Sequence, residues 1–177
     1  MNEPLQTARL TLRRPIEADV QAVFGGYASD PEVTKYLAWP RHTSIDDTKW
    51  FLRFSDDQWA RWPAGPLLMF SRAEGALVGG TGLGFEAPDR AITGYVLVRS
   101  QWGKGFATEA LGAMVDLARA SGVRRLSATC HVDHRASSHV LEKCAFTREA
   151  VLKRQTVFPN LAPDPADVFL YTQILQP

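Results

Sequence analysis

The residues best suited to chemistry lie between positions 95 and 110, where a strand pattern leads into a glycine-rich turn and then into a helix pattern. In such a turn, the first backbone N–H groups of the helix have no partner and point into one space at the positive end of the helix dipole. Gly103, Gly105 and Ala107 would let an anion approach the main chain, and Thr108 adds a hydroxyl donor. The pattern predicts a phosphate site, with a tight turn that binds nothing as the alternative.

Two better-known phosphate motifs are excluded. A Walker A loop needs Gly-Lys followed by Ser or Thr, so that the hydroxyl can hold magnesium, whereas Lys104 is followed by Gly105. Residues 80–84 contain the glycines of a dinucleotide fingerprint but lead into residues 85–88, which open no helix. The sequence therefore supports neither ATP hydrolysis nor dinucleotide binding at these glycines.

Hydrophobic patterns predict the elements on either side of the turn. Strand patterns occur at residues 9–13, 67–72, 76–85, 92–98, 125–132 and 168–175. Helical spacing occurs at residues 17–27, from Ser44 onward, at 108–120 and at 136–143. The order β-α-α-β-β-β-α-β-α-β, with a further strand left open after Phe146, predicts an α/β (α+β) fold. The three prolines of residues 158–166 predict a long loop.

The helix that begins at Ser44 has a recognisable start. The Ser44 hydroxyl can cap free N–H groups, and Asp47 completes an S-x-x-D capping box. Trp50, Phe51 and Phe54 then form one apolar face, which predicts that Trp50 packs in the helix core.

Length and composition fit one folded domain, residues 1–177, with 45% hydrophobic and 22% charged residues. The 20 Lys and Arg against 19 Asp and Glu give a net charge of +1, which excludes a dedicated nucleic-acid binder. No uncharged apolar run approaches the roughly 20 residues that span a bilayer, so we expect a cytosolic protein without a membrane partner. Cys130 and Cys144 form no C-x-x-C pair and are expected to be reduced thiols.

Several segments resemble, in order, the GNAT N-acetyltransferases and, more closely, the branch that includes the ribosomal-protein N-terminal acetyltransferases. These segments are residues 7–13, 30–33, 77–83, 102–110 and 140–146, so that the resemblance covers nearly the whole chain. It implies a single GNAT-like domain with a mixed, mostly antiparallel central sheet and helices on both faces. It also implies a V-shaped splay between the fourth and fifth strands, at residues 92–98 and 125–132.

The resemblance implies that the acetyl group of acetyl-CoA is transferred directly to an amine, without an acyl-enzyme. The amine is a protein or peptide N-terminus or a small molecule, and a homodimer is left open. Ile92 and His134 depart from the family pattern and motivate an alternative. This alternative is a GNAT-fold module that binds acyl-CoA with little or no turnover.

The resemblance also assigns residues to the cofactor. The pyrophosphate would lie on the N–H groups of the glycine-rich loop, and the pantetheine arm would pair with the exposed main chain of Val96 and Val98 as an added strand does. His134 stands where the family has the Asn that anchors pantetheine, and an imidazole can donate one hydrogen bond. The cofactor residues so predicted are Val96, Leu97, Val98, Gly103, Lys104, Gly105, Phe106, Ala107, Thr108 and His134.

Two residues are predicted to be catalytic. Ser137, retained from the family's Asn-x-x-Ser, would protonate the departing thiolate, with a helix cap as its alternative role. Ile92 occupies the position at which many family members carry a glutamate base. His131 is a predicted substitute because its reference pKa of about 6.5 suits proton transfer. Glu86 and Asp89 are alternatives, and a route through water without any side chain is favoured over His131 because Ile92 removes the carboxylate.

The remaining reactive side chains are expected to be structural. Cys130 on a strand and Cys144 on an apolar helix face favour packing over nucleophilic roles. The spacing of His131, His134 and His139 lacks a carboxylate ligand set, so no metal is expected.

The resemblance places the acceptor side in residues 36–62 and 155–167. Trp39, Trp50, Trp59 and Trp62 are candidates to line this side, although packing in the helix core is the favoured interpretation for Trp50.

Overall fold

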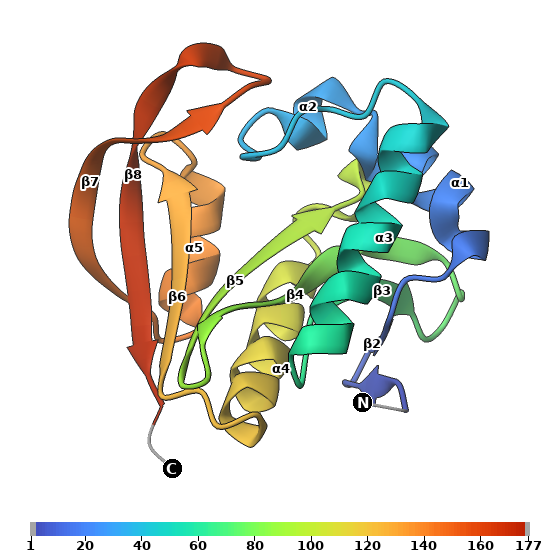
Figure 1. Ribbon diagram of the computed structural model, residues 1–177, viewed down its shortest axis with the longest axis horizontal. Coiled ribbons are helices and arrows are strands. Elements are labelled where there is room, and N and C mark those ends of the chain that lie inside the picture. The colour runs from blue at the N-terminus through green and yellow to red at the C-terminus, as the bar shows by residue number, and fades with distance from the viewer. Residues whose placement is uncertain (1–2, 176–177) are drawn as a thin grey trace.

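The computed structural model describes residues 3–175 as one eight-stranded sheet with helices packed on it (Figure 1). The strands are β1 (Leu5–Gln6), β2 (Leu10–Arg13), β3 (Pro66–Ser71), β4 (Leu77–Ala87), β5 (Arg90–Leu97), β6 (Arg125–His131), β7 (Thr147–Phe158) and β8 (Ala162–Ile174). The helices are α1 (Val20–Val23), α2 (Pro31–Thr34), α3 (Ile45–Arg61), α4 (Phe106–Ala120) and α5 (Arg135–Lys143). The predicted helix at 17–27 is confirmed as a 3₁₀ turn, α1 and a π turn in succession. The open prediction of a strand after Phe146 is confirmed as β7.

The sheet order is β1-β2-β3-β4-β5-β6-β8-β7, and every neighbouring pair is antiparallel except β5 and β6. These two strands run parallel and pair only from Arg90 opposite Arg125 to Ile92 opposite Ser127. Beyond Ile92, β5 stays with β4, while β6 stays with β8. The predicted V-shaped splay is confirmed, and β1 is the one strand of the described chain that precedes the predicted first strand.

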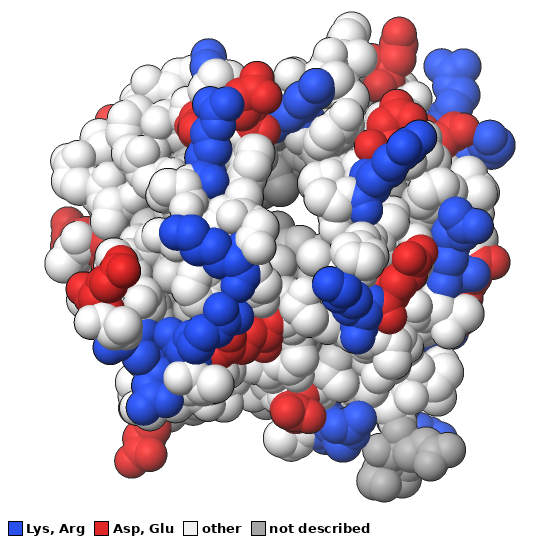
Figure 2. All heavy atoms as spheres, turned by 180° about the vertical axis from the view of Figure 1, so that it is seen from behind, with Lys and Arg blue, Asp and Glu red and all other residues white. Residues whose placement is uncertain are grey.

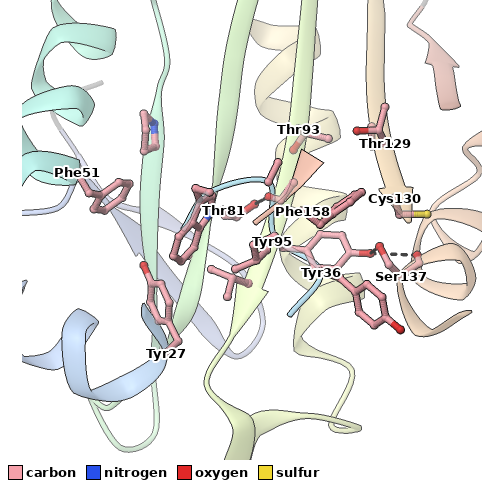
Figure 3. Close-up of a pocket in the computed structure, with 18 of the residues that line it drawn as sticks. Tyr27, Tyr36, Phe51, Thr81, Thr93, Tyr95, Thr129, Cys130, Ser137 and Phe158 are labelled. Carbon is pink, nitrogen blue, oxygen red and sulfur yellow. Dashed lines mark hydrogen bonds between the residues drawn. The ribbon is translucent and has the colours of Figure 1, made fainter. Parts of the chain in front are cut away.

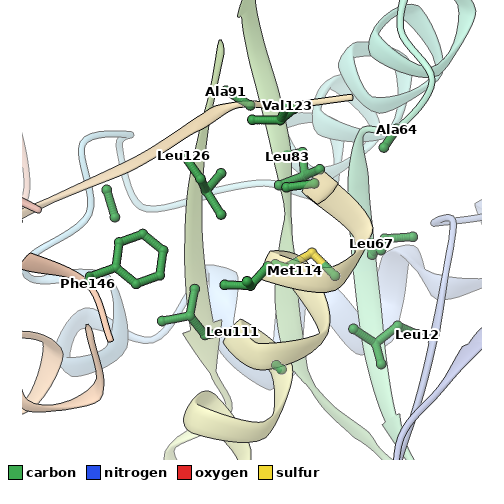
Figure 4. Packing of buried hydrophobic residues seen from close by; sticks show 14 of the residues in the cluster. Leu12, Ala64, Leu67, Leu83, Ala91, Leu111, Met114, Val123, Leu126 and Phe146 are labelled. Carbon is green, nitrogen blue, oxygen red and sulfur yellow. The ribbon is translucent and has the colours of Figure 1, made fainter. Parts of the chain in front are cut away.

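Helices cover both faces of the sheet, as the resemblance implied. On β3, Leu68 packs with Val23 and Tyr27 of the segment around α1. The neighbouring Leu67, whose side chain alternates to the other face, belongs to the main core with Met114 of α4 (Figure 4). This main core holds α4 against β4 and β5, so that the end of β5 leads directly into the start of α4.

The predicted long loop at 158–166 is wrong. β7 and β8 form a hairpin in which Val157 pairs with Pro165. β6 pairs with β8 only from Val168 onward, so the first part of β8 has a neighbour on one side only. A proline has no N–H to donate, and a strand segment with one neighbour needs fewer donors, so Pro163 and Pro165 are compatible with this part of β8.

The turn of this hairpin closes one end of the splay. Asn160 donates from Nδ2 to the carbonyl oxygens of Thr34 and Trp39, at 2.9 Å each. The backbone N–H of Arg41 donates to Asn160 Oδ1 at 2.7 Å. Three hydrogen bonds thus fix the segment after α2 to the β7–β8 turn.

Candidate active site

The glycine-rich loop has the backbone shape expected of an anion site. Gly103 and Gly105 have φ of +74° and +81°, and Gly105 is the residue immediately before α4. A Cβ at Gly103 would meet no atom within 4 Å, so the left-handed backbone rather than lack of space favours glycine there. The N–H groups of Phe106 and Ala107 in the first helical turn have no intrahelical partner. The loop therefore presents donors at the positive end of the α4 dipole.

Residues from the amino-terminal segment brace this loop. Glu109 on α4 accepts hydrogen bonds from Thr7 Oγ1, from Arg9 N at 2.7 Å and from Arg9 Nε at 2.6 Å. Arg9 also donates to the Lys104 carbonyl at 2.9 Å, and its guanidinium lies 4.5 Å from the centre of the Phe106 ring. Burial opposes ionisation, yet these hydrogen bonds hold the pKa of Glu109 below its usual value. Sequence reasoning used Thr7 and Arg9 only as a family signature and missed this brace.

The main chain of Val98 does not face the splay, which corrects one predicted cofactor contact. Val98 N donates to Val78 O on β4 at 2.9 Å, and Val98 O accepts from Gln101 N at 2.9 Å. The Val96 carbonyl also points towards β4, because a Cβ added to Gly79 would lie 2.0 Å from it. The prediction that Val96 and Val98 offer exposed main chain to pantetheine is therefore wrong.

The polar main-chain groups of a strand point alternately to its two sides, so those of Tyr95 and Leu97 face the splay. The Leu97 carbonyl accepts a hydrogen bond from the Trp102 indole at 3.0 Å. Leu97 was also predicted to bind the cofactor. Its carbonyl oxygen faces the splay, whereas the main-chain groups of Val96 and Val98 do not.

A cavity of about 580 Å³ lies where β5 and β6 diverge (Figure 3). β5 contributes Thr93, Gly94, Tyr95 and Val96, β6 contributes Ala128, Thr129 and Cys130, and the segment of α5 contributes His134, Ser137 and Leu141. The opposite wall comes from the segment around α1 and α2, from α3, and from Thr156 and Phe158 of β7.

Two hydroxyl groups bridge the cavity from β5 to α5. Tyr95 Oη lies 3.0 Å from Ser137 Oγ and donates to the Ser137 carbonyl at 3.1 Å (Figure 3). Burial raises the pKa of Tyr95 well above its usual value, so the phenol keeps its proton. The N-cap of α5 is His134, not Ser137, so the alternative role of Ser137 as a cap is excluded. Tyr95 was not predicted as a site residue, because a strand tyrosine gives no sign of a partner 42 positions away.

Of the two predicted histidines, one lines the cavity and the other lies behind the cavity wall. His134 lines the cavity and stacks on Tyr36 with ring centres 4.7 Å apart. Burial, with nearby His131, lowers the pKa of His134, so its ring is uncharged near neutral pH. His131 is 7% exposed and does not line the cavity; it lies against Tyr36 and the edge of Phe158, both of which do. The structure therefore does not bring His131 to the reacting groups.

The other candidate bases lie outside the cavity as well. Glu86 and Asp89 are exposed at the turn between β4 and β5. The Asp89 carbonyl accepts from the N–H groups of Arg124 and Arg125, which is a structural role. Ile92 is 47% exposed and does not line the cavity.

His42 lines the cavity and was missed by sequence reasoning. Its Nδ1 lies 2.8 Å from the buried hydroxyl of Thr48, and its ring centre is 5.2 Å from that of Trp39. Burial lowers the pKa of His42, and the nearby charge of Asp47 opposes this only in part. Its loop shows no periodicity, so no sequence signal pointed to this uncharged imidazole.

The four tryptophans considered for the acceptor side separate into two groups. Trp39 and Trp50 line the cavity, whereas Trp59 is a core residue and Trp62 stacks on Phe85. The Ser44–Asp47 capping box is confirmed, but the prediction that Trp50 packs in the helix core is wrong. The buried face of α3 consists of Thr48, Leu52, Ser55 and Trp59. Trp50 is 63% exposed because it lies on another face of the helix.

Neither thiol has the environment of a nucleophile. Cys130 lines the cavity with its Sγ 3.5 Å from Ser138 Oγ, and burial raises its pKa. Burial also raises the pKa of Cys144. Both groups therefore stay protonated near neutral pH.

Other site classes leave no trace in the part of the chain that the structure describes. Residues 3–175 contain no cluster of three metal-ligating side chains, and no helix among them is long and apolar enough to cross a membrane. Figure 2 shows basic and acidic side chains interspersed over one face, and no single sign of charge covers that face.

Comparison with known proteins agrees with this geometry. Residues 9–147 match the family described as "Acetyltransferase (GNAT) domain". An uncharacterized N-acetyltransferase of Bacillus licheniformis, p20, is 30% identical over 154 residues, which cover 85% of this chain and 86% of that protein. An uncharacterized N-acetyltransferase of Bacillus subtilis (strain 168), YoaA, is 30% identical over 175 residues, which cover 93% and 94%.

Among solved structures, the chain is similar to RimL, a ribosomal L7/L12 α-N-protein acetyltransferase, in complex with coenzyme A. The two chains are 27% identical with a TM-score of 0.86, and the match covers 98% of each. The likeness extends through the splay and the glycine-rich loop, since nearly the whole chain is matched.

Proposed function

The chain belongs to the GNAT acetyltransferase family and is an N-acetyltransferase that uses acetyl-CoA, and we propose that its acceptor amine reacts in the cavity beside Ser137 and Tyr95. The observation that carries this proposal is the hydroxyl pair that spans the splay, with 3.0 Å between Tyr95 Oη and Ser137 Oγ. No other pair of proton-bearing side chains among residues 3–175 joins β5 to α5 across the cavity.

The cofactor is proposed to follow β5 towards the start of α4. The N–H groups from Gly103 to Thr108 would bind the pyrophosphate, aided by the helix dipole. The amide groups of the pantetheine arm would pair with the main chain of Tyr95 and Leu97, and the Leu97 carbonyl would then exchange the Trp102 indole for a pantetheine amide. His134, beside Ser137 at the start of α5, would border the same arm.

The acetyl transfer itself needs one bond formed and one broken. The neutral amine attacks the thioester carbonyl, the C–N bond forms, and the C–S bond then breaks. Ser137 Oγ donates a proton to the departing thiolate and regains one from solvent, while the Tyr95 phenol, which keeps its own proton, orients this hydroxyl. The amine proton must leave as well, and His42 is the proposed proton acceptor because its imidazole is neutral and lines the cavity.

Steady-state thiol release tests this proposal. The wild-type protein should release CoA from acetyl-CoA only when an amine is present, and the acetylated amine should appear in equal amount. Acetyl-CoA binding by calorimetry without amine-dependent release from any amine would instead support a binding or regulatory module.

Two further predictions are independent of this chemistry. If the chain forms a homodimer, analytical ultracentrifugation should give a mass of twice 19.6 kDa. A cytosolic location predicts recovery in the soluble fraction of cells that express the full chain.

A further inference from the structure

We infer that the acceptor is a primary amine carried on an aromatic or large apolar group, with no second charge near the amine. This inference rests on the proposed function and concerns the same cavity. It follows from the chemistry of the walls, from the exposed aromatic side chains at one side and from the way that side is held in place.

The walls of the cavity carry no formal charge. Among residues 3–175, those that line it include no Asp, Glu, Lys or Arg. The two histidines of the lining, His42 and His134, are uncharged near neutral pH because burial lowers the pKa of each. A diamine or polyamine would have to place a second ammonium in this space without a carboxylate partner, which is unfavourable. The cavity therefore selects against polycations and against acceptors with a carboxylate beside the amine.

The α3 side of the cavity offers aromatic surface instead. Trp50 and Phe54 stack with ring planes 10° apart and centres 6.0 Å apart, and both line the cavity. They remain 63% and 41% exposed. Large aromatic side chains that stay exposed at a cavity are typical of surfaces that cover an apolar ligand. Phe51 and Trp39 add further aromatic side chains to the lining of the cavity.

The segment between α2 and α3, which forms part of the same wall, is fixed rather than free to adapt. The Asn160 side chain binds the carbonyl oxygens of Thr34 and Trp39, and thereby holds the segment that carries Tyr36 and Trp39. Because these hydrogen bonds fix the wall, we expect the shape of the cavity beside Trp39 and Trp50 to discriminate between acceptors. About 580 Å³ must also admit the acetyl-bearing end of the cofactor, so the space that remains takes one aromatic or large apolar group rather than several residues of a peptide. Either a free aromatic amine or the first residue of a peptide satisfies this chemistry.

The reaction balances without a further reactant. Acetyl-CoA and R–NH₂ give R–NH–acetyl and CoA–SH: the amine nitrogen forms the new C–N bond, the C–S bond breaks, and one amine proton ends on the thiol. No oxidant, metal or second cofactor enters.

The test compares matched amines with saturating acetyl-CoA and wild-type protein. We expect kcat/KM for tryptamine and phenylethylamine to exceed that for 1,5-diaminopentane and spermidine by about 10-fold or more, since apolar contact and a buried second charge act in the same direction. Peptides that begin with Trp or with Asp form a second arm. Preference for the Trp peptide over tryptamine identifies a protein N-terminus as the source, and the reverse identifies a free amine.

Variants test whether the aromatic surface causes this preference. Trp50→Ala should raise KM for tryptamine about 10-fold while kcat changes little, and Trp50→Phe should restore most of the loss. Phe54→Glu should shift the preference towards 1,5-diaminopentane by placing a carboxylate at the cavity. Trp62→Ala is the matched control, because Trp62 stacks on Phe85 and does not line the cavity, and it should leave KM unchanged.

The outcomes separate a wrong acceptor class from a wrong proposed function. If wild type uses diamines as well as tryptamine, or if Trp50→Ala leaves the tryptamine KM unchanged, the acceptor class is wrong while the acetyl transfer stands. If no amine of either panel releases CoA, the proposed function fails first.

Discussion

The two halves of the proposed active site are built differently. The cofactor half is main chain: one continuous segment in which β5 ends, two glycines turn with positive φ and α4 begins. The acceptor half consists of side chains from α3, the segment before it, β5, β6, α5 and β7. Main-chain chemistry is the same for any side chain, so the first half suits a cofactor common to a family. The second half can change residue by residue, and we therefore expect it to determine the acceptor specificity.

The largest effect is expected when a side chain is introduced into the main-chain cofactor half. Gly105→Glu should lower acetyl-CoA affinity about 100-fold or more, because a non-glycine residue at φ +81° is strained by about 1–3 kcal/mol and its carboxylate repels the pyrophosphate. Calorimetry measures the affinity. Gly105→Asn is the matched control, since Asn tolerates the left-handed conformation and adds no charge. Equal affinity in wild type and a folded Gly105→Glu protein would refute the loop assignment.

The hydroxyl pair between the two halves should affect turnover rather than binding. Ser137→Ala should lower kcat about 100-fold with acetyl-CoA affinity nearly intact, since proton donation matters in the transition state. Tyr95→Phe should lower kcat less, because it leaves the Ser137 hydroxyl in place. Melting temperature separates catalysis from structure: His134, not Ser137, is the N-cap of α5, so Ser137→Ala should cost little stability. Full activity in Ser137→Ala would remove the serine from the mechanism.

How much the sequence predicts follows the same division. The loop, the capping box at Ser44 and the splay could be predicted because each depends on contiguous residues or on a family pattern. The direction of the Val98 amide could not, because it depends on the register with Val78. His42 could not be found either, since its place in the cavity depends on contacts across separate elements. The prolines of β8 misled because their strand has a neighbour on one side only at that point.

The pH dependence of kcat/KM tests the role of His42 in the acceptor half. A protonated His42 cannot accept the amine proton, so kcat/KM should fall as pH decreases through the pKa of His42. That pKa lies below the ordinary 6.5 because burial lowers it and Asp47 opposes only in part. From pH 6.5 upward kcat/KM should therefore follow the ionisation of the acceptor alone and rise towards the acceptor's own pKa, about 8 for an α-amino group and about 10.4 for a lysine-like amine.

His42→Gln provides the comparison for this titration. It should remove the fall of kcat/KM at acidic pH that His42 causes, called the acidic limb here, and reduce kcat/KM by about 10- to 100-fold. His131→Gln serves as the matched variant, because His131 does not line the cavity and its loss should keep the limb. If the limb disappears with His131 and persists without His42, the proton acceptor is reassigned to His131, as the sequence alone suggested.

The smallest expected effect concerns the brace on the cofactor loop. Glu109→Gln keeps the shape of the side chain but removes the charge that orients Arg9, whose guanidinium also holds the Lys104 carbonyl. Hydrogen bonds to charged groups contribute about 1.5–3 kcal/mol, and the Arg9 side chain is half exposed, so a loss near the lower end is expected. Acetyl-CoA affinity should fall a few-fold, while KM for the amine stays unchanged because no part of the brace lines the acceptor cavity. The pKa of Glu109 is lowered in the folded protein, so this contribution is present at neutral pH and is lost as pH falls through that pKa. The affinity difference between wild type and Glu109→Gln should therefore shrink in acid. A constant difference down to acidic pH would mean that the brace acts through packing alone.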